Sequence, residues 1–367
     1  MTDFIKKKAR PEIFSIKPYV PGKPIDEVKR ELGLEDIIKL ASNENPLGPS
    51  PAAVAAISTA LPKLQLYPDA NCYYLKAKIA AVTGLNQDNV VIGNGSDELL
   101  KLIAETFLNK DDNIIFANPS FSEYEFTARI MGAQCIAVPL TNFTHDLDAM
   151  VQAITPQTKL IYICNPNNPT GTIVTSEQTD AFMRQIPEDI LVIFDEAYYE
   201  YVDSKSYSSG IKYINQGRNV IVLRTFSKIY GLASLRVGYG LTTPAIAGAI
   251  ERVTEPFNVN TLAQVGALAA IDDQDHVLKS HKVNSAGKEY LYAEFDALGL
   301  KYVPTEANFI FVDTGRNCQE VFSKLLAQGV IVRSGDIFGY DTFIRVTVGT
   351  QEENARFISS LKKVLEA

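Results

Sequence analysis

Seven short apolar segments, separated by stretches of helical periodicity, limit most strongly what this chain can fold into. Aliphatic and β-branched side chains dominate each segment and polar residues bound it, which is typical of strands buried in a sheet. Regular alternation of strands and helices predicts an α/β domain with a mostly parallel seven-stranded sheet flanked by helices. Ligands of such a domain bind at the carboxyl ends of the strands. The seven segments are residues 89–92, 113–117, 134–138, 159–164, 190–194, 219–224 and 236–241.

Beyond residue 242 the pattern changes to longer helical stretches followed by three short strands, which predicts a smaller α+β domain. The first forty residues contain four prolines and predict an extended arm that packs with this smaller domain. The predicted divisions are an arm at 1–40, a large α/β domain at 41–255 and a small domain at 256–367.

Composition excludes several classes of function. The 367 residues exceed the size at which a single core stops growing, so two packed regions are expected. A net charge of −8 without a basic stripe argues against a nucleic-acid partner, and no apolar run is long enough for a membrane span. The four cysteines and three histidines are scattered without metal-ligand spacing, so no metal is expected. A cytoplasmic enzyme fits these observations.

Lys228 lies in the loop that leaves the strand predicted at 219–224. A desolvated lysine loses its proton readily and can then attack a carbonyl to form a Schiff base. Thr225, Ser227 and Arg236 surround it with hydroxyls and a guanidinium that suit a phosphate. The implied ligand is an aldehyde that carries a phosphate, and pyridoxal phosphate is the obvious candidate.

Asp195 ends another buried strand, where a carboxylate is costly unless it meets a cation such as a pyridinium nitrogen. Tyr198 and Asn168 could both donate to the phenolic oxygen of the ring, and Lys228 could act as general acid and base. The glycine turn at 93–98, which leads into a helix, is a ready anion site. Each of these residues also has an ordinary interpretation, as a turn cap, a core tyrosine, a turn former or a capped helix.

Taken together, these motifs resemble the fold-type I, class II, pyridoxal-phosphate aminotransferases over nearly the whole chain. The cofactor motifs that carry the resemblance are residues 168–171, Asp195-x-x-Tyr198, Ser227-Lys228 and Arg236-Val237-Gly238. More specific motifs resemble the branch of that family that acts on histidinol phosphate: residues 41–46, 67–68, 95–98, 118–121 and 343–350.

The resemblance implies a role for each matching residue. Lys228 would form the imine, Asp195 would contact the pyridine nitrogen, and Tyr198 with Asn168 would contact the phenolic oxygen. Phe121 would stack on the ring, and the bond before Pro169 would be cis. Tyr67 would reach the cofactor phosphate from the neighbouring subunit of a homodimer. The other residues that would hold the phosphate are Gly95, Ser96, Asp97, Thr225, Ser227 and Arg236.

The substrate residues implied by the resemblance are Arg345 for the carboxylate of glutamate, with Arg333, Tyr19 and Asn43 around it. The implied reaction is ping-pong transamination between L-histidinol phosphate and 2-oxoglutarate, so one pocket must accept a phosphate and a carboxylate.

An aromatic amino-acid aminotransferase and a threonine-phosphate decarboxylase would retain every cofactor residue and stay open as alternatives. A cofactor-sensing regulator would need a DNA-binding segment, and the chain has neither the length nor the basic patch for one.

Overall fold

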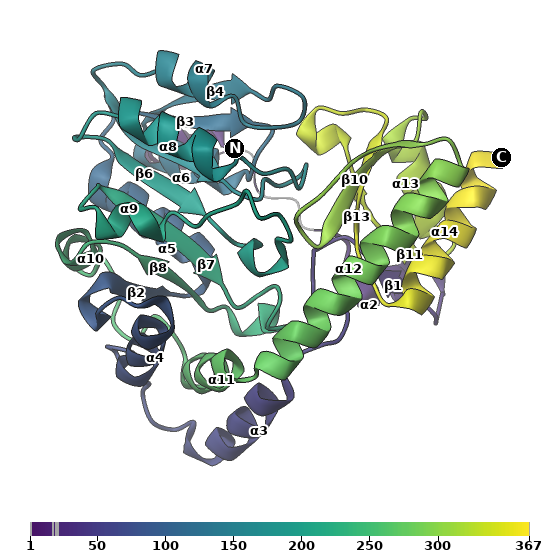
Figure 1. The fold of residues 1–367 in the computed structure, drawn as a ribbon, viewed down its shortest axis with the longest axis horizontal. Coiled ribbons are helices and arrows are strands. Elements are labelled where there is room, and N and C mark those ends of the chain that lie inside the picture. The colour runs from purple at the N-terminus through teal and green to yellow at the C-terminus, as the bar shows by residue number, and fades with distance from the viewer. Residues whose placement is uncertain (1, 17, 19–21, 367) are drawn as a thin grey trace.

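The computed structural model describes residues 2–16, 18 and 22–366, and it contains the predicted seven-stranded sheet (Figure 1). All neighbouring strands are parallel except β8, which is antiparallel to both of its neighbours. The strand order is β2 (Val90–Gly93), β8 (Gly238–Leu241), β7 (Val220–Thr225), β6 (Leu191–Asp195), β5 (Thr158–Cys164), β3 (Asn113–Asn118) and β4 (Gln134–Pro139).

Two buried clusters cover the two faces of this sheet, because successive side chains of a strand point to opposite faces. The first face carries α5 (Gly95–Phe107), α6 (Glu123–Met131) and α10 (Pro244–Ile250). The second carries α4 (Tyr73–Thr83), α7 (Leu147–Gln152), α8 (Ser176–Gln185), α9 (Ile211–Asn215) and α11 (Thr261–Asp272). The central strands β6 and β7 are buried along their whole length, which explains their almost continuous apolar sequences.

The seventh strand was predicted from residue 236, but it begins at Gly238. Arg236 adopts a left-handed backbone conformation with φ of 54°, so an extended strand cannot start there.

The smaller unit is an antiparallel sheet covered by long helices. Its strand order is β12 (Arg333–Ser334), β13 (Phe343–Thr347), β10 (Phe309–Asp313) and β9 (Lys301–Val303). The helices are α12 (Gln274–Ala297), α13 (Cys318–Leu326) and α14 (Gln351–Glu366). Figure 1 shows this unit beside the large sheet, with α12 running diagonally from beside α11 across the smaller unit.

Residues 22–40 lie against the smaller unit. The short strand β1 (Ile38–Lys39) pairs in parallel with β11 (Val330–Ile331), and Val28 of α2 (Ile25–Leu32) packs with Ile331.

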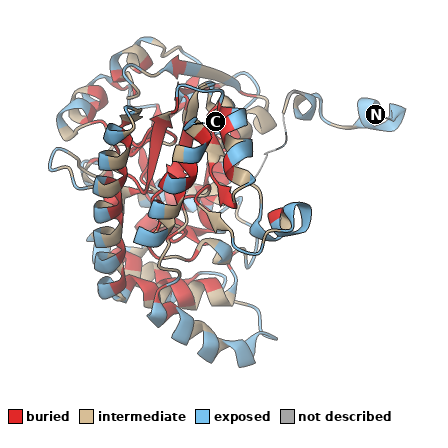
Figure 2. Ribbon diagram, turned by 90° about the vertical axis from the view of Figure 1, so that its right-hand side faces the viewer, coloured by how far each residue is buried: buried red, intermediate tan, exposed pale blue. Residues whose placement is uncertain are grey.

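The preceding residues differ from the predicted extended arm, since they form α1 (Asp3–Lys8) and the 3-10 helix η1 (Pro11–Ser15). Pro11 sits in the first turn of η1, where a missing N–H costs nothing. Figure 2 shows the exposed α1 standing away from the rest of the chain. In contrast, η1 contacts α6, and Arg10, just before η1, donates a hydrogen bond to the carbonyl of Ile130.

The division of the chain into an arm and two domains stays a prediction. The buried alanines of α11 pack with the large sheet, so the contacts favour a boundary at the start of α12, later than residue 255. Within the described residues, no helix is both long and apolar enough to cross a membrane.

Candidate active site

Lys228 follows β7 in a loop whose backbone carbonyls accept hydrogen bonds from the segment at residues 42–50. Its Nζ donates a hydrogen bond to the carbonyl oxygen of Ser42 over 3.2 Å and lies 5.7 Å from the ring centre of Tyr198. Burial, and to a smaller extent the positive charge of Arg345, lower the pKa of Lys228 to about 8. The amine can therefore be neutral at moderately alkaline pH, which a nucleophile or a general base requires.

Asp195 is buried at the carboxyl end of β6, with 3% of its surface exposed. Its carboxylate accepts hydrogen bonds from Tyr124 Oη over 2.6 Å and from the backbone N–H of Ala197 over 3.2 Å. Burial raises the pKa of Asp195 to about 6, and the two hydrogen bonds oppose that change. The carboxylate is therefore ionised at neutral pH and has the geometry to pair with a cation.

Tyr124 is a site residue that the sequence analysis missed. It lies on α6 three residues after Phe121, and the two rings meet edge to face with centroids 5.8 Å apart. Phe121 lies before α6, which begins at Glu123, so no helical spacing links the two residues in the sequence. The Tyr124 phenol points at the buried carboxylate of Asp195, and only the packing of α6 on the sheet shows this contact.

Tyr124→Phe tests the contribution of this hydrogen bond. The bond favours the charged form of Asp195, so its loss should raise the pKa of that carboxylate further above 6. A hydrogen bond to a charged group contributes about 1.5–3 kcal/mol, so the acid limb of the pH profile of kcat/KM should move upward by roughly one to two pH units. An unchanged acid limb would show that Asp195 does not control it.

Tyr198 and Asn43 meet at the same site. Asn43 Nδ2 donates to Tyr198 Oη over 3.0 Å, and burial raises the pKa of this phenol above its usual value. Asn168 accepts a hydrogen bond from the guanidinium of Arg345, and the peptide bond before Pro169 is cis, as predicted. The contacts of Tyr198 and Asn168 with a phenolic oxygen stay a prediction.

The N-terminus of α5 forms a cradle of the kind a phosphate needs. Arg236 lies over it, paired with Asp97 at 2.8 Å and within 3.5 Å of Ser227 Oγ. Gly95 has φ of +79°, and a Cβ there would collide with the guanidinium of Arg236. A Cβ on Gly238 would lie 2.6 Å from the backbone nitrogen of Ser96.

The free amides of this helix end, the hydroxyls of Thr225 and Ser227 and the guanidinium of Arg236 are a donor set that fits a phosphate. The residues present therefore fit pyridoxal phosphate, with Lys228 for its aldehyde and Asp195 for its ring nitrogen.

Arg345 approaches the same region from β13 of the smaller unit. The side chain is buried, donates to the carbonyl of Ala41 over 2.8 Å, and lies 5.2 and 5.6 Å from the ring centres of Phe309 and Phe338. Arg333 is directly opposite Arg345 in the antiparallel β12–β13 pair, so the two side chains lie on one face of the sheet. Two guanidinium groups on one face suit an anion.

The roles of two further residues stay predictions. Tyr67 is 82% exposed and stacks on Phe257 with ring centres 4.7 Å apart, so it lies on the surface of this chain. Tyr19 lies outside the described residues.

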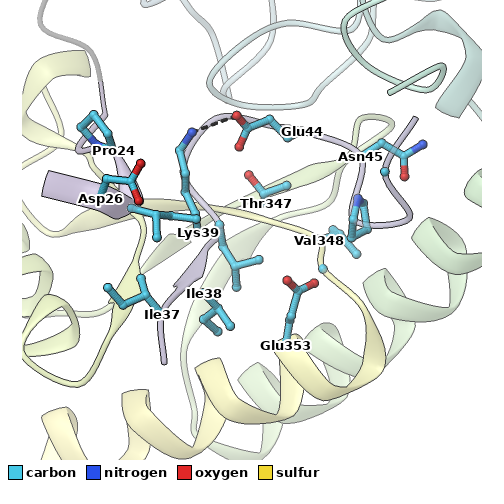
Figure 3. Close-up of a pocket in the computed structure, with 15 residues that line it drawn as sticks. Pro24, Asp26, Ile37, Ile38, Lys39, Glu44, Asn45, Thr347, Val348 and Glu353 are labelled. Atoms are coloured by element: carbon cyan, nitrogen blue, oxygen red, sulfur yellow. Dashed lines mark hydrogen bonds and ion pairs between the residues drawn. The ribbon is translucent and has the colours of Figure 1, made fainter. Parts of the chain in front are cut away.

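The cavity shown in Figure 3, of about 430 Å³, is a neighbouring feature and not the site itself. Fifteen described residues line it, and neither Lys228 nor Asp195 is among them. It lies beside α2 and β1, and an ion pair of 2.8 Å between Lys39 and Glu44 crosses its edge.

Comparisons with known proteins point in one direction. The family described as aminotransferase class I and II matches residues 35–361. A histidinol-phosphate aminotransferase from Moorella thermoacetica is 61% identical over 359 residues, which cover 98% of this chain and 93% of the relative. One from Caldicellulosiruptor saccharolyticus is 49% identical over 356 residues, covering 97% and 99%. The crystal structure of histidinol-phosphate aminotransferase from Sinorhizobium meliloti in complex with pyridoxal-5'-phosphate has a TM-score of 0.90 at 26% identity, covering 98% of both chains.

Proposed function

The chain belongs to the class I and II aminotransferase family, and we propose that it interconverts L-histidinol phosphate and 2-oxoglutarate with imidazole-acetol phosphate and L-glutamate. This transamination is a step of histidine biosynthesis, and it depends on pyridoxal phosphate. The observation that carries the proposal is that Lys228, the buried Asp195 and the buried Arg345 all lie near Tyr198: the lysine Nζ is 5.7 Å from its ring centre, and the charges of Arg345 and Asp195 act on its phenol.

When bound, pyridoxal phosphate supplies an aldehyde that takes up the amino group and a ring that accepts electrons from the substrate Cα. Lys228 would hold the aldehyde carbon, and the N-terminus of α5 with Thr225, Ser227 and Arg236 would hold the phosphate. Phe121, half-buried beside Tyr124, would lie against the ring.

Lys228 Nζ would carry a proton to and from the substrate Cα. Its lowered pKa, about 8, lets the amine accept a proton near neutral pH and return it, which a lysine of ordinary pKa does poorly. Asp195 would hold a negative charge opposite the ring nitrogen, and the hydrogen bond from Tyr124 holds its carboxylate in one orientation. Tyr198, oriented by Asn43, would donate from its Oη to the phenolic oxygen.

Arg345 would bind the anionic end of both substrates. A planar guanidinium forks equally well onto a carboxylate or a phosphate, so one pocket can serve glutamate and histidinol phosphate in alternate half-reactions. Arg333 from the opposite strand would add a second positive charge for the more highly charged phosphate. Tyr19 and Asn43 stay predicted neighbours of this pocket.

Arg345→Ala should therefore weaken both substrates together. Losing a buried charge-assisted pair costs about 2–4 kcal/mol, or roughly 30- to 700-fold in kcat/KM for each substrate. The measurement is steady-state kinetics with glutamate and with histidinol phosphate. Arg356→Ala is a matched control, because Arg356 pairs with Asp36 on the surface. A loss for only one of the two substrates would disprove the shared pocket.

A panel of amino donors tests the proposed reaction against its alternatives. The wild-type protein should convert its bound cofactor to the aminated form with either glutamate or histidinol phosphate, and should release no carbon dioxide. An aromatic amino-acid aminotransferase would prefer phenylalanine to histidinol phosphate. A threonine-phosphate decarboxylase would give carbon dioxide from threonine phosphate and no half-reaction with glutamate.

We further infer that the active form is a homodimer located in the cytoplasm. A run of large apolar side chains on η2 (Leu61–Lys63) and the residues after it is between 48 and 82% exposed, which is unusual for a monomer's surface. These residues are Leu61, Leu64, Leu66, Tyr67, Tyr73 and Tyr74. A second copy would cover them and bring Tyr67 to the partner's phosphate cradle.

Light scattering should give a mass of about 81 kDa, twice the 40.4 kDa of one chain. If Tyr67 acts across the interface, mixing Tyr67→Ala with Lys228→Ala chains should produce sites with both residues intact and regain activity that Lys228→Ala lacks. A monomer of full activity would contradict the shared site.

A further inference from the structure

A buried ion pair lies directly behind the cofactor side of the large sheet. Glu196 follows Asp195 at the end of β6, and Arg224 precedes Thr225 at the end of β7. Because successive side chains alternate between faces, Asp195 and Thr225 share one face and the ion pair occupies the other. The contacts agree with this, since Asp195 meets Tyr124 of α6 whereas Glu196 meets the loop before α9.

The geometry of the pair is fully defined by hydrogen bonds. Arg224 donates from Nε and Nη2 to Glu196 Oε2 over 3.1 and 2.8 Å, and from Nη2 to Ser209 Oγ over 3.1 Å. The other carboxylate oxygen accepts from the backbone N–H of Gly210 over 2.7 Å. The guanidinium lies 3.5 Å from the ring centre of Tyr199. The side chains of Arg224 and Glu196 are only 5% and 1% exposed.

A buried pair of this kind is poorly explained by stability alone, since apolar residues of similar volume hold two strands together equally well. A hydrophobic contact, however, does not fix the orientation of one strand end relative to the other, whereas several directed hydrogen bonds do. Burial raises the pKa of Glu200, close to the same cluster, to about 8, which favours its neutral form beside the ion pair.

We propose that Glu196 and Arg224 are positioning residues that lock the ends of β6 and β7 in one relative placement. This placement sets the spacing between Asp195 and the loop from Thr225 to Lys228, so that one cofactor meets both. The proposal rests on the proposed function, because it concerns how tightly the protein holds pyridoxal phosphate and how fast it turns over.

The test is a double variant, Glu196→Gln with Arg224→Met. Glutamine keeps an acceptor for Gly210 and both changes conserve volume, so neither a buried charge nor a cavity remains. The variant should unfold within a few degrees of the wild type. Cofactor release from the holoenzyme, followed by its visible absorbance on dilution, should show a dissociation constant raised by about tenfold or more. We expect kcat to fall by a similar factor while KM for glutamate stays within about twofold.

The same substitutions at the exposed pair of α6, Glu125→Gln with Arg129→Met, are the matched control and should leave both quantities unchanged. Wild-type cofactor affinity and kcat in the Glu196/Arg224 variant would overturn the proposal.

If that double variant does not fold, Arg224→Lys tests the same proposal. Lysine keeps the positive charge but loses the two-nitrogen contact with Glu196 and the hydrogen bond to Ser209. It should fold and release the cofactor about threefold more readily or more, and wild-type affinity and kcat would overturn the proposal. Failure of the proposed function is distinguishable, since it would appear as absent transamination in the wild type, whatever the affinity for pyridoxal phosphate.

Discussion

Lys228→Ala is expected to lower transamination by at least about 10⁴-fold, because in the proposed mechanism one amine both anchors the cofactor and moves the proton at Cα. The visible absorbance of the covalently held cofactor should disappear. The protein should remain folded and keep the wild-type mass, since within the described residues the lysine side chain makes one hydrogen bond, to Ser42, and packs in no apolar cluster. Absorbance spectra and a single-turnover assay with glutamate measure these effects.

Lys282→Ala, which removes an exposed lysine from α12, is the control and should behave as the wild type. Turnover of histidinol phosphate by Lys228→Ala with added pyridoxal phosphate, at anything near the wild-type rate, would show that another group carries the proton.

Asp195→Asn should separate function from stability. The pKa of Asp195 is about 6 in the folded protein against an ordinary 3.8, so the folded state binds more protons than the unfolded state between these values. Stability therefore falls as pH rises through this window, and above pH 6 the buried charge costs about 3 kcal/mol. Removing the charge should stabilise the cofactor-free protein at pH 7.5 by up to that amount.

The same substitution should lower kcat by about 10²- to 10³-fold, because the charge proposed to face the ring nitrogen is lost while the side chain keeps its size and planar shape. Thermal unfolding of the cofactor-free protein and steady-state kinetics of the holoenzyme measure the two effects. A variant that is both less stable and fully active would reverse the interpretation of Asp195.

The parts of the fold that follow from sequence are those with a strong local signal. The continuous apolar runs of β5, β6 and β7 predict buried parallel strands, and the polar residues that follow them must then gather at one edge. The sequence alone therefore predicts that Asp195 and Lys228 belong to one site. A local signal also marks the start of α3 (Pro51–Ala60), where Ser50 precedes a proline and accepts a hydrogen bond from Ala53 N.

What escaped prediction depends on contacts between distant segments. The two-residue strands β1 and β12 have no periodicity of their own and exist only because β11 and β13 lie beside them. The hydrogen bond from Tyr124 to Asp195 spans 71 positions in the sequence, and the pair of Glu196 with Arg224 spans 28. The left-handed conformation of Arg236 also gives no sequence signal, since arginine rarely adopts it.

A crystal structure with pyridoxal phosphate bound would decide whether Lys228 and Asp195 hold the same ring. We expect continuous density from Lys228 Nζ to the aldehyde carbon, and the pyridine nitrogen within about 2.7–3.0 Å of the Asp195 carboxylate. A cofactor attached to a different lysine, or a ring nitrogen that faces any group other than Asp195, would contradict the mechanism.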